Sequence, residues 1–138
     1  MNVVDIFVIL VFIHFVVDWI FQTHYEAMNK GINAWVRALH CTIYAAGFLP
    51  ILLYFNSLKW VATALYVLWV SHFFEDTYKP VIWWFRNIRR HPAFNSGDFD
   101  FKKFLAESPL HYILLIAIDQ IIHISFLWIV AVIIYSNM

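Results

Sequence analysis

Four stretches of the chain are apolar over the length that a membrane-crossing helix needs, and polar residues separate them. A hydrocarbon core of about 30 Å takes about 20 mostly apolar residues in a helix. In lipid, only helices and closed barrels leave no backbone group unpaired. The pattern therefore predicts crossing helices over residues 3–22, 34–55, 60–78 and 110–135. We expect an all-α fold in which residues 1–138 form one integral membrane domain, a four-helix bundle.

The connections between these stretches differ in kind. Residues 56–59 form a short link, so the second and third helices are expected to be antiparallel neighbours. Lys79 and Pro80 open the longest connection, because proline disfavours helical geometry in the residue before it. The segment 81–107 mixes aromatic and cationic residues, which is typical of amphipathic helices that lie in the membrane interface. A turn is expected over residues 95–98.

Composition agrees with a membrane protein. Hydrophobic residues make up 63% of the chain and charged residues 13%, whereas soluble domains have about 45–50% and about 25%. The mean hydropathy is +0.72. The formal net charge is zero, so nothing favours nucleic acid as a partner. The expected partners are membrane lipids, and a second copy of the chain could help to enclose the polar groups. A single cysteine excludes an internal disulfide.

Basic residues predict the orientation. They gather in the first and third connections, whereas Lys59 is the only one on the opposite face. Because cytoplasmic loops carry an excess of Lys and Arg, both termini are expected to be extracytoplasmic. On this topology the polar residues inside the four stretches fall in one layer near the cytoplasmic side.

Those polar residues recur at helical spacing. They are His14, Asp18 and Gln22 in the first stretch, His40 in the second, His72 and Asp76 in the third, and Asp119, Gln120 and His123 in the fourth. Residues four apart share one side of a helix. Ionisable side chains at membrane depth are expensive, so their concentration indicates function.

Imidazole and carboxylate are ligands that suit zinc, iron and manganese, and facing helices of a bundle can combine them into a metal centre. Seven candidate metal ligands result: His14, Asp18, His40, His72, Asp76, Asp119 and His123. A tetrahedral zinc ion takes four ligands, so either two ions bind or some of the seven have other roles. The expected cofactor is one or two divalent ions, with zinc first and manganese or iron as alternatives.

The positions of the candidate residues along the chain also suggest catalytic, ligand-orienting and headgroup-binding roles. We expect Asp18, Asp76 and Asp119 to be catalytic, and Gln22, Gln120 and Lys79 to orient the ligands. Candidate binders of an anionic headgroup or substrate are Arg37, Arg86, Arg89 and Arg90. Glu75 points about 100° away from Asp76 on a helix, so a surface or ligand-orienting position is expected for it.

Polar residues in membrane helices can also have roles that involve no metal. Such side chains can join helices by hydrogen bonds, although Ser, Thr, Asn and Gln usually do so. A proton or ion pathway would need polar residues through the whole membrane. The other half of the predicted bundle offers little beyond Asp5, Thr42 and Thr63.

Taken together, the motifs HxxxDxxxQ, an isolated His, HxxxDxxKP and DQxxH resemble a family of small bacterial and phage membrane proteins, a domain of unknown function. The matching residues are His14, Asp18, Gln22, His40, His72, Asp76, Lys79, Pro80, Asp119, Gln120 and His123. The resemblance covers essentially the whole chain and implies a four-helix fold in a bacterial inner membrane, without a settled activity. A looser resemblance is to membrane-bound metal-dependent hydrolases.

The sequence leaves three functions open. The first is a metal-dependent hydrolase of a phosphate-containing or lipid-like substrate that enters from the cytoplasmic leaflet, since two metal ions suit phosphate-ester hydrolysis. The second is a transporter or channel for protons or a divalent metal. The third is a non-catalytic membrane interaction protein, in a phage or host envelope, with a structural ion.

Overall fold

The computed structural model describes residues 1–55, 57–95 and 100–138, and this part of the chain is helical without any strand. The all-α expectation is therefore confirmed. The elements are α1 (Val3–Phe15), η1 (Val16–Ile20), α2 (His24–Asn29), α3 (Ala34–Phe55), α4 (Leu58–Glu75), α5 (Lys79–Asn87), η2 (Pro92–Asn95), α6 (Phe101–Glu107) and α7 (Pro109–Tyr135). Most of the turn expected over residues 95–98, and position 56 of the short link, lie outside the described residues.

Three helical stretches are long and apolar enough to cross a membrane: Val3–Ile20, Ala34–Phe55 and Pro109–Tyr135. The helix expected as the third crossing, α4, is not among them. It has 18 residues and carries Lys59 near its start and His72 and Glu75 near its end, which lowers its apolar character. The fold thus supports a membrane protein with three candidate crossings, and a crossing by α4 stays a prediction.

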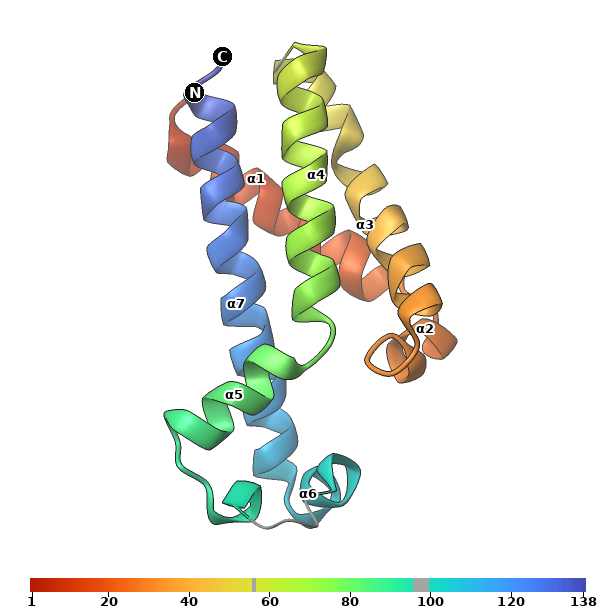
Figure 1. The fold of residues 1–138 in the computed structure, drawn as a ribbon. Coiled ribbons are helices and arrows are strands. Elements are labelled where there is room, and N and C mark those ends of the chain that lie inside the picture. Colours follow the sequence, from red (N-terminus) through yellow and green to blue (C-terminus); the bar gives the residue numbers. More distant parts are fainter. Residues whose placement is uncertain (56, 96–99) are drawn as a thin grey trace.

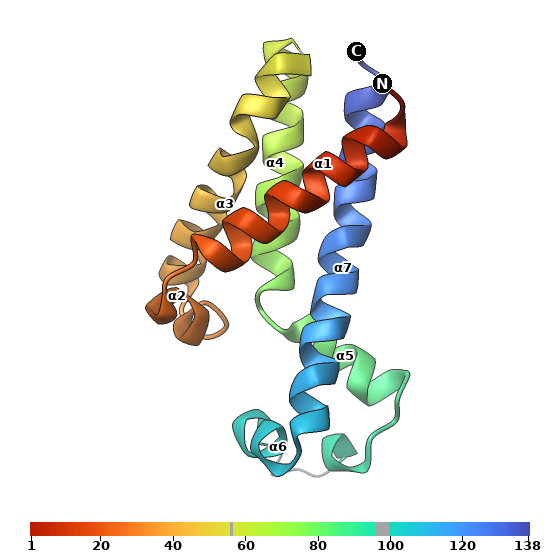
Figure 2. The same ribbon diagram turned by 180° about the vertical axis from the view of Figure 1, so that it is seen from behind.

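The long helices form one assembly in which α4 is central (Figure 1). Helix α4 packs against α3 and α7, and α1 packs against α7 and α3. Seen from behind, α1 crosses the other three helices obliquely (Figure 2). Both termini, the end of α3 and the start of α4 lie at one end of the assembly, and α2, α5 and α6 lie toward the other (Figure 1).

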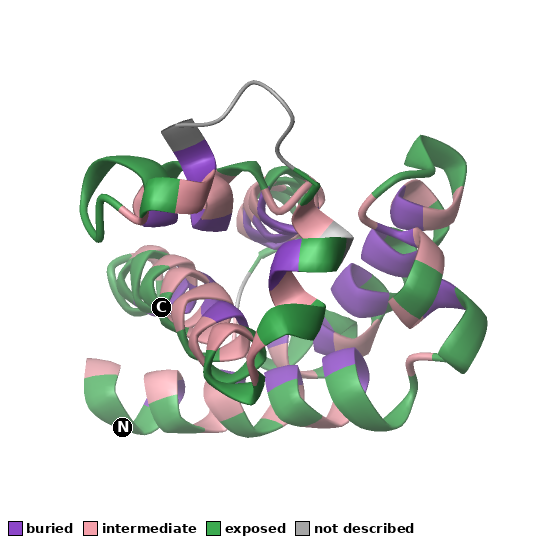
Figure 3. Cartoon of the chain, turned by 90° about the horizontal axis from the view of Figure 1, so that it is seen from below, coloured by how far each residue is buried: buried purple, intermediate pink, exposed green. Residues whose placement is uncertain are grey.

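An apolar core fills the end of the assembly near the termini. Its buried residues include Ile6 and Leu10 of α1, Phe48 and Leu52 of α3, and Ile134 of α7. Buried positions lie mainly on the sides where helices face one another (Figure 3). The buried ionisable groups of these helices lie toward the opposite end.

The expected interfacial segment 81–107 folds into α5, η2 and α6 beside α7. A second apolar cluster holds these short helices to α7, with Phe85 of α5, Phe104 of α6 and Leu115 of α7 all buried. Arg86, on the other side of α5, is exposed. The segment is therefore amphipathic, as the composition predicts, and its place in a membrane interface remains a prediction.

Two local features bring α1 and α3 together where the polar groups begin. After Phe15 the helix widens into the π-helical turn η1, in which the Phe21 amide donates to the Val16 carbonyl at 3.1 Å. At Gly47 of α3, an added Cβ would overlap the Val17 side chain. The absence of a side chain at Gly47 thus permits η1 to approach α3 closely.

Candidate metal centre

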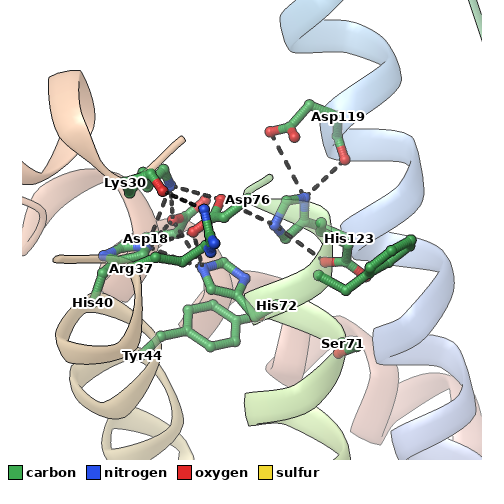
Figure 4. Close-up of polar contacts among 12 residues, drawn as sticks. Asp18, Lys30, Arg37, His40, Tyr44, Ser71, His72, Asp76, Asp119 and His123 are labelled. Carbon is green, nitrogen blue, oxygen red and sulfur yellow. Dashed lines mark hydrogen bonds and ion pairs between the residues drawn. The ribbon is translucent and has the colours of Figure 1, made fainter. Parts of the chain in front are cut away.

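Ionisable side chains from every long helix converge at the end of the bundle remote from the termini (Figure 4). The buried members are His14, Asp18, Lys30, Arg37, His40, His72, Glu75, Asp76 and His123, each at most 9% exposed. The structure therefore joins into one cluster residues that the sequence places on separate helices. Asp119, whose side chain is 16% exposed, lies at its edge.

Four ligand atoms form the tightest part of the cluster: Asp18 Oδ1, His40 Nε2, His72 Nε2 and Asp76 Oδ2. The His40 nitrogen lies 3.0 Å from the Asp18 atom, 3.0 Å from the His72 atom and 3.5 Å from the Asp76 atom. The His72 nitrogen lies 3.5 Å from the Asp18 atom and 3.4 Å from the Asp76 atom. Ligand atoms bound at about 2.0–2.1 Å to a tetrahedral zinc ion are about 3.3 Å apart. These five distances are in the range found around one small cation, and they are hydrogen-bond and ion-pair distances as well.

Two overlapping groups have the proximity that a metal ion requires. Ligand atoms of His40, His72 and Asp76 all lie within 4.8 Å of one another, and so do those of Asp18, His72 and His123. Every member is buried. Because neutral imidazole and carboxylate are good ligands for several divalent metals, both groups could hold an ion.

Lys30 lies inside the first group. Its Nζ is 3.0 Å from Asp76 Oδ1, 3.3 Å from Asp18 Oδ1 and 3.2 Å from His40 Nε2. Burial lowers the pKa of this amino group, but the charges of Asp76 and Asp18 outweigh burial and hold the pKa above its usual value. The ammonium thus supplies positive charge to two buried carboxylates.

The position of Lys30 is set by α2 and by Arg37. Thr23 caps α2: its hydroxyl oxygen accepts from the Glu26 amide at 3.2 Å, and its own amide donates to Glu26 Oε2 at 2.8 Å. Arg37 Nη1 donates to the carbonyl oxygen of Lys30 at 2.8 Å. The guanidinium of Arg37 therefore holds backbone at the end of α2, and it forms no ion pair within the described residues.

His123 faces a second pair of carboxylates. Its Nδ1 lies 2.8 Å from the Asp119 carbonyl oxygen, which can only accept, so Nδ1 carries the proton. In the neutral ring, Nε2 is then an acceptor. That Nε2 lies 3.1 Å from Glu75 Oε2, and the Asp119 carboxylate lies 3.7 Å from Nδ1 on the other side of the ring.

His14 is buried in a hydrogen-bonded position outside both groups. Its Nε2 donates to Gln120 Oε1 at 2.9 Å, and its Nδ1 lies 3.1 Å from the Tyr44 hydroxyl. The Tyr44 ring stacks on His72, with ring centroids 3.7 Å apart. Both nitrogens of His14 are thus engaged, and binding of His14 to an ion would require one of these bonds to break.

The remaining predicted residues divide between the cluster and the surface. Gln22 Nε2 lies 3.2 Å from His40 Nε2, and Gln120 contacts His14, so both amides lie beside candidate ligands. Lys79 is exposed and lines an apolar groove outside the cluster. The arginines Arg86, Arg89 and Arg90 are exposed on α5 or just after it.

The polar pattern of the sequence did not identify three buried residues that lie beside the candidate ligands: Glu75, Lys30 and Tyr44. For Glu75 the surface alternative is wrong, since its side chain is 2% exposed, and the ligand-orienting alternative stays a prediction. Helix α4 ends at Glu75 and the chain turns at Asp76, so both side chains meet neighbouring helices. Lys30 served only as one of the basic residues that predict the orientation in the membrane. Nothing in the sequence shows that α2 folds back over α3 and so brings Lys30 to the cluster. Tyr44 follows His40 by four residues, and that spacing on one helix face was the available indication.

The family model described as "Protein of unknown function (DUF3307)" matches residues 6–138. The chain belongs to this family. The DUF3307 match includes every residue of the cluster, but the family is uncharacterised and brings no activity with it. No curated protein and no solved structure matches the chain, so the looser resemblance to metal-dependent hydrolases gains no support.

Proposed function

We propose that this protein is an integral membrane hydrolase that uses a buried divalent ion, zinc, to cleave a phosphate-containing, lipid-like substrate. The observation that carries the proposal is the set of 3.0–3.5 Å distances among Asp18, His40, His72 and Asp76. Two imidazoles and two carboxylates suit zinc, with manganese or iron as alternatives. When bound, such an ion lowers the pKa of a water molecule and polarises a phosphoryl oxygen.

The chain's own residues supply the other functions. The Lys30 ammonium holds the carboxylates of Asp18 and Asp76 and adds positive charge where a phosphate would be bound. Asp119 is more accessible than the other carboxylates of the cluster and lies beside His123, so it is the best-placed group to take a proton.

An apolar groove next to the cluster supports a lipid-like substrate. It has a volume of about 600 Å³ and lies between the end of α4, the start of α5 and α7. Its lining residues are Phe74, Lys79, Pro80, Trp83, Trp84, Ile118, Ile121 and Ile122. Phe74, Ile118 and Ile122 directly precede Glu75, Asp119 and His123 in the chain. A hydrocarbon chain in the groove would thus lie close to the cluster, with Lys79 available for an anionic headgroup.

The apolar core argues against transport through the bundle. Ile6, Leu10, Phe48, Leu52 and Leu68 pack together between the cluster and the end that carries the termini. A conducting path needs polar groups or water on both sides of the binding site. Within the described residues, this packing supports a site reached from one side.

The first test measures metal in the purified protein. We expect metal copurifying with the wild type and a clear loss of metal in His72→Ala, because His72 belongs to both candidate ligand groups. His24→Ala, which removes an exposed histidine, is the matched control and should retain the metal. Metal content unchanged in His72→Ala would refute the proposal.

The second test measures hydrolysis of phosphorylated lipids with added zinc, manganese or iron. Asp119→Ala should retain metal but lose about 10²–10⁴-fold in rate, as expected when a general base is removed. Metal uptake by proteoliposomes without any hydrolysis would instead favour transport and would reject the enzyme.

A further inference from the structure

Two hydrogen-bond acceptors face each other in the buried interior. His123 Nδ1 donates to the Asp119 carbonyl, which leaves Nε2 with a lone pair in the neutral ring. This Nε2 lies 3.1 Å from Glu75 Oε2. Neither Glu75 Oε1 nor His123 Nε2 has a hydrogen-bond partner among the described residues. A cation between the ring and the carboxylate would satisfy both.

The charges near this pair are also unbalanced. Lys30 forms ion pairs with Asp18 and Asp76. The ion pairs of Glu75 and Asp119, within the described part of the chain, involve only His123. Glu75 is 2% exposed, so water does little to stabilise its charge. Two carboxylates therefore share one imidazole, where a divalent ion would balance both.

Asp76 connects this pair to the first group of ligands. Its Oδ2 faces His40 and His72, while its Oδ1 lies 3.9 Å from His123 Nε2. Ligand atoms of Asp18, His72 and His123 also lie within 4.8 Å of one another. A second ion at His123 would thus be adjacent to the first, as in two-metal sites, where ions are about 3.5–4 Å apart.

We infer that Glu75 and His123 hold a second divalent ion, linked to the first by the carboxylate of Asp76, so that the pair of ions binds the oxygens of a phosphate ester. This inference rests on the proposed function, because it extends the same centre. It assigns Glu75 as a metal ligand, a role that its offset from Asp76 on the helix does not suggest.

The experiment is a zinc titration of the detergent-solubilised protein, stripped of metal first, with bound zinc counted per chain. We expect two ions in the wild type and one in Glu75→Gln. Glu107→Gln, which neutralises an exposed glutamate, should still bind two. Glu75→Asp keeps the charge with a shorter reach, and we expect weaker binding of the second ion, with two still bound at saturating zinc.

Electron paramagnetic resonance gives a second measure of the number of bound ions, and it does not depend on enzyme activity. With manganese in place of zinc, two neighbouring ions give a spin-coupled electron paramagnetic resonance spectrum, and we expect Glu75→Gln to give that of one isolated ion. One ion per chain in both the wild type and Glu75→Gln would overturn the inference and leave the proposed function standing. No ion in the wild type would overturn both.

Discussion

The Lys30 ammonium occupies the space between the two carboxylates that would also serve a metal ion. It lies 3.0 Å from Asp76 Oδ1 and 3.3 Å from Asp18 Oδ1. Its side chain is 9% exposed, and these carboxylates are buried as well. Since charges in such an environment need a partner, Lys30 stabilises the cluster when no ion is bound. A bound ion would take over part of this role.

This argument predicts a metal-dependent effect of Lys30→Met, which keeps the aliphatic stem and removes the charge. The variant should destabilise the metal-free protein by about 3–5 kcal/mol, the usual effect of removing one partner of a buried ion pair. Saturating zinc should restore much of that loss. Thermal unfolding in detergent, with chelator and with zinc, measures both values. Lys103→Met, at an exposed position, is the control, and an equal loss with and without zinc would contradict the argument.

At the level of single residues, the sequence indicates the candidate ligands better than the residues that contact them. The spacing of His14 with Asp18 and of His72 with Asp76 puts each pair on one face of a helix, and all four are buried in the cluster. Contacts between residues on different helices are not predicted by this spacing. The approach of Lys30 to Asp76 and of Glu75 to His123 depends on packing that periodicity does not encode.

At the scale of the elements, apolar patterning predicts the long helices well. Helix α3 begins and ends at the expected residues, and α7 begins one residue before its predicted start. The π-helical turn η1 was not predicted, because a local change of helical pitch leaves no mark in the apolar pattern. It lies where Asp18 enters the cluster, with Val17 against Gly47 of α3.

The close approach at Gly47 gives a prediction about packing. Gly47→Ala should destabilise the protein by about 1–3 kcal/mol, since the added methyl group meets Val17 in a packed core. The better helix propensity of alanine would offset at most about 1 kcal/mol. Combining the change with Val17→Ala should recover stability in a thermal unfolding assay. A double variant less stable than either single one would show that the overlap is not the cause.

For the whole molecule, the arrangement of ends agrees with the predicted topology. The termini, the end of α3 and the start of α4 share one end of the assembly, and the arginine-bearing α5 lies toward the other (Figure 1). Which end faces the cytoplasm, and whether α4 crosses the membrane, remain predictions from the distribution of basic residues.

Cysteine labelling in intact cells tests both points. A membrane-impermeant maleimide should label Ser57→Cys and Ser136→Cys from outside, and Asn87→Cys only after the cells are permeabilised, because these exposed sites flank α4 and α7. The buried native Cys41 should stay unlabelled and serves as an internal control. Labelling of positions 57 and 87 from the same side would show that α4 does not cross.

The candidate ligands come from distant parts of the chain, which affects the order in which a metal centre could form. Asp18 comes from η1, His40 from α3, Asp76 from the end of α4 and His123 from α7. In the proposed centre no single segment supplies all four ligands, Asp18, His40, His72 and Asp76, so an ion would load only after η1, α3 and α4 have docked during biogenesis. Once enclosed, the ion would escape only as fast as the helices part, and its retention would then reflect the lifetime of the assembled bundle.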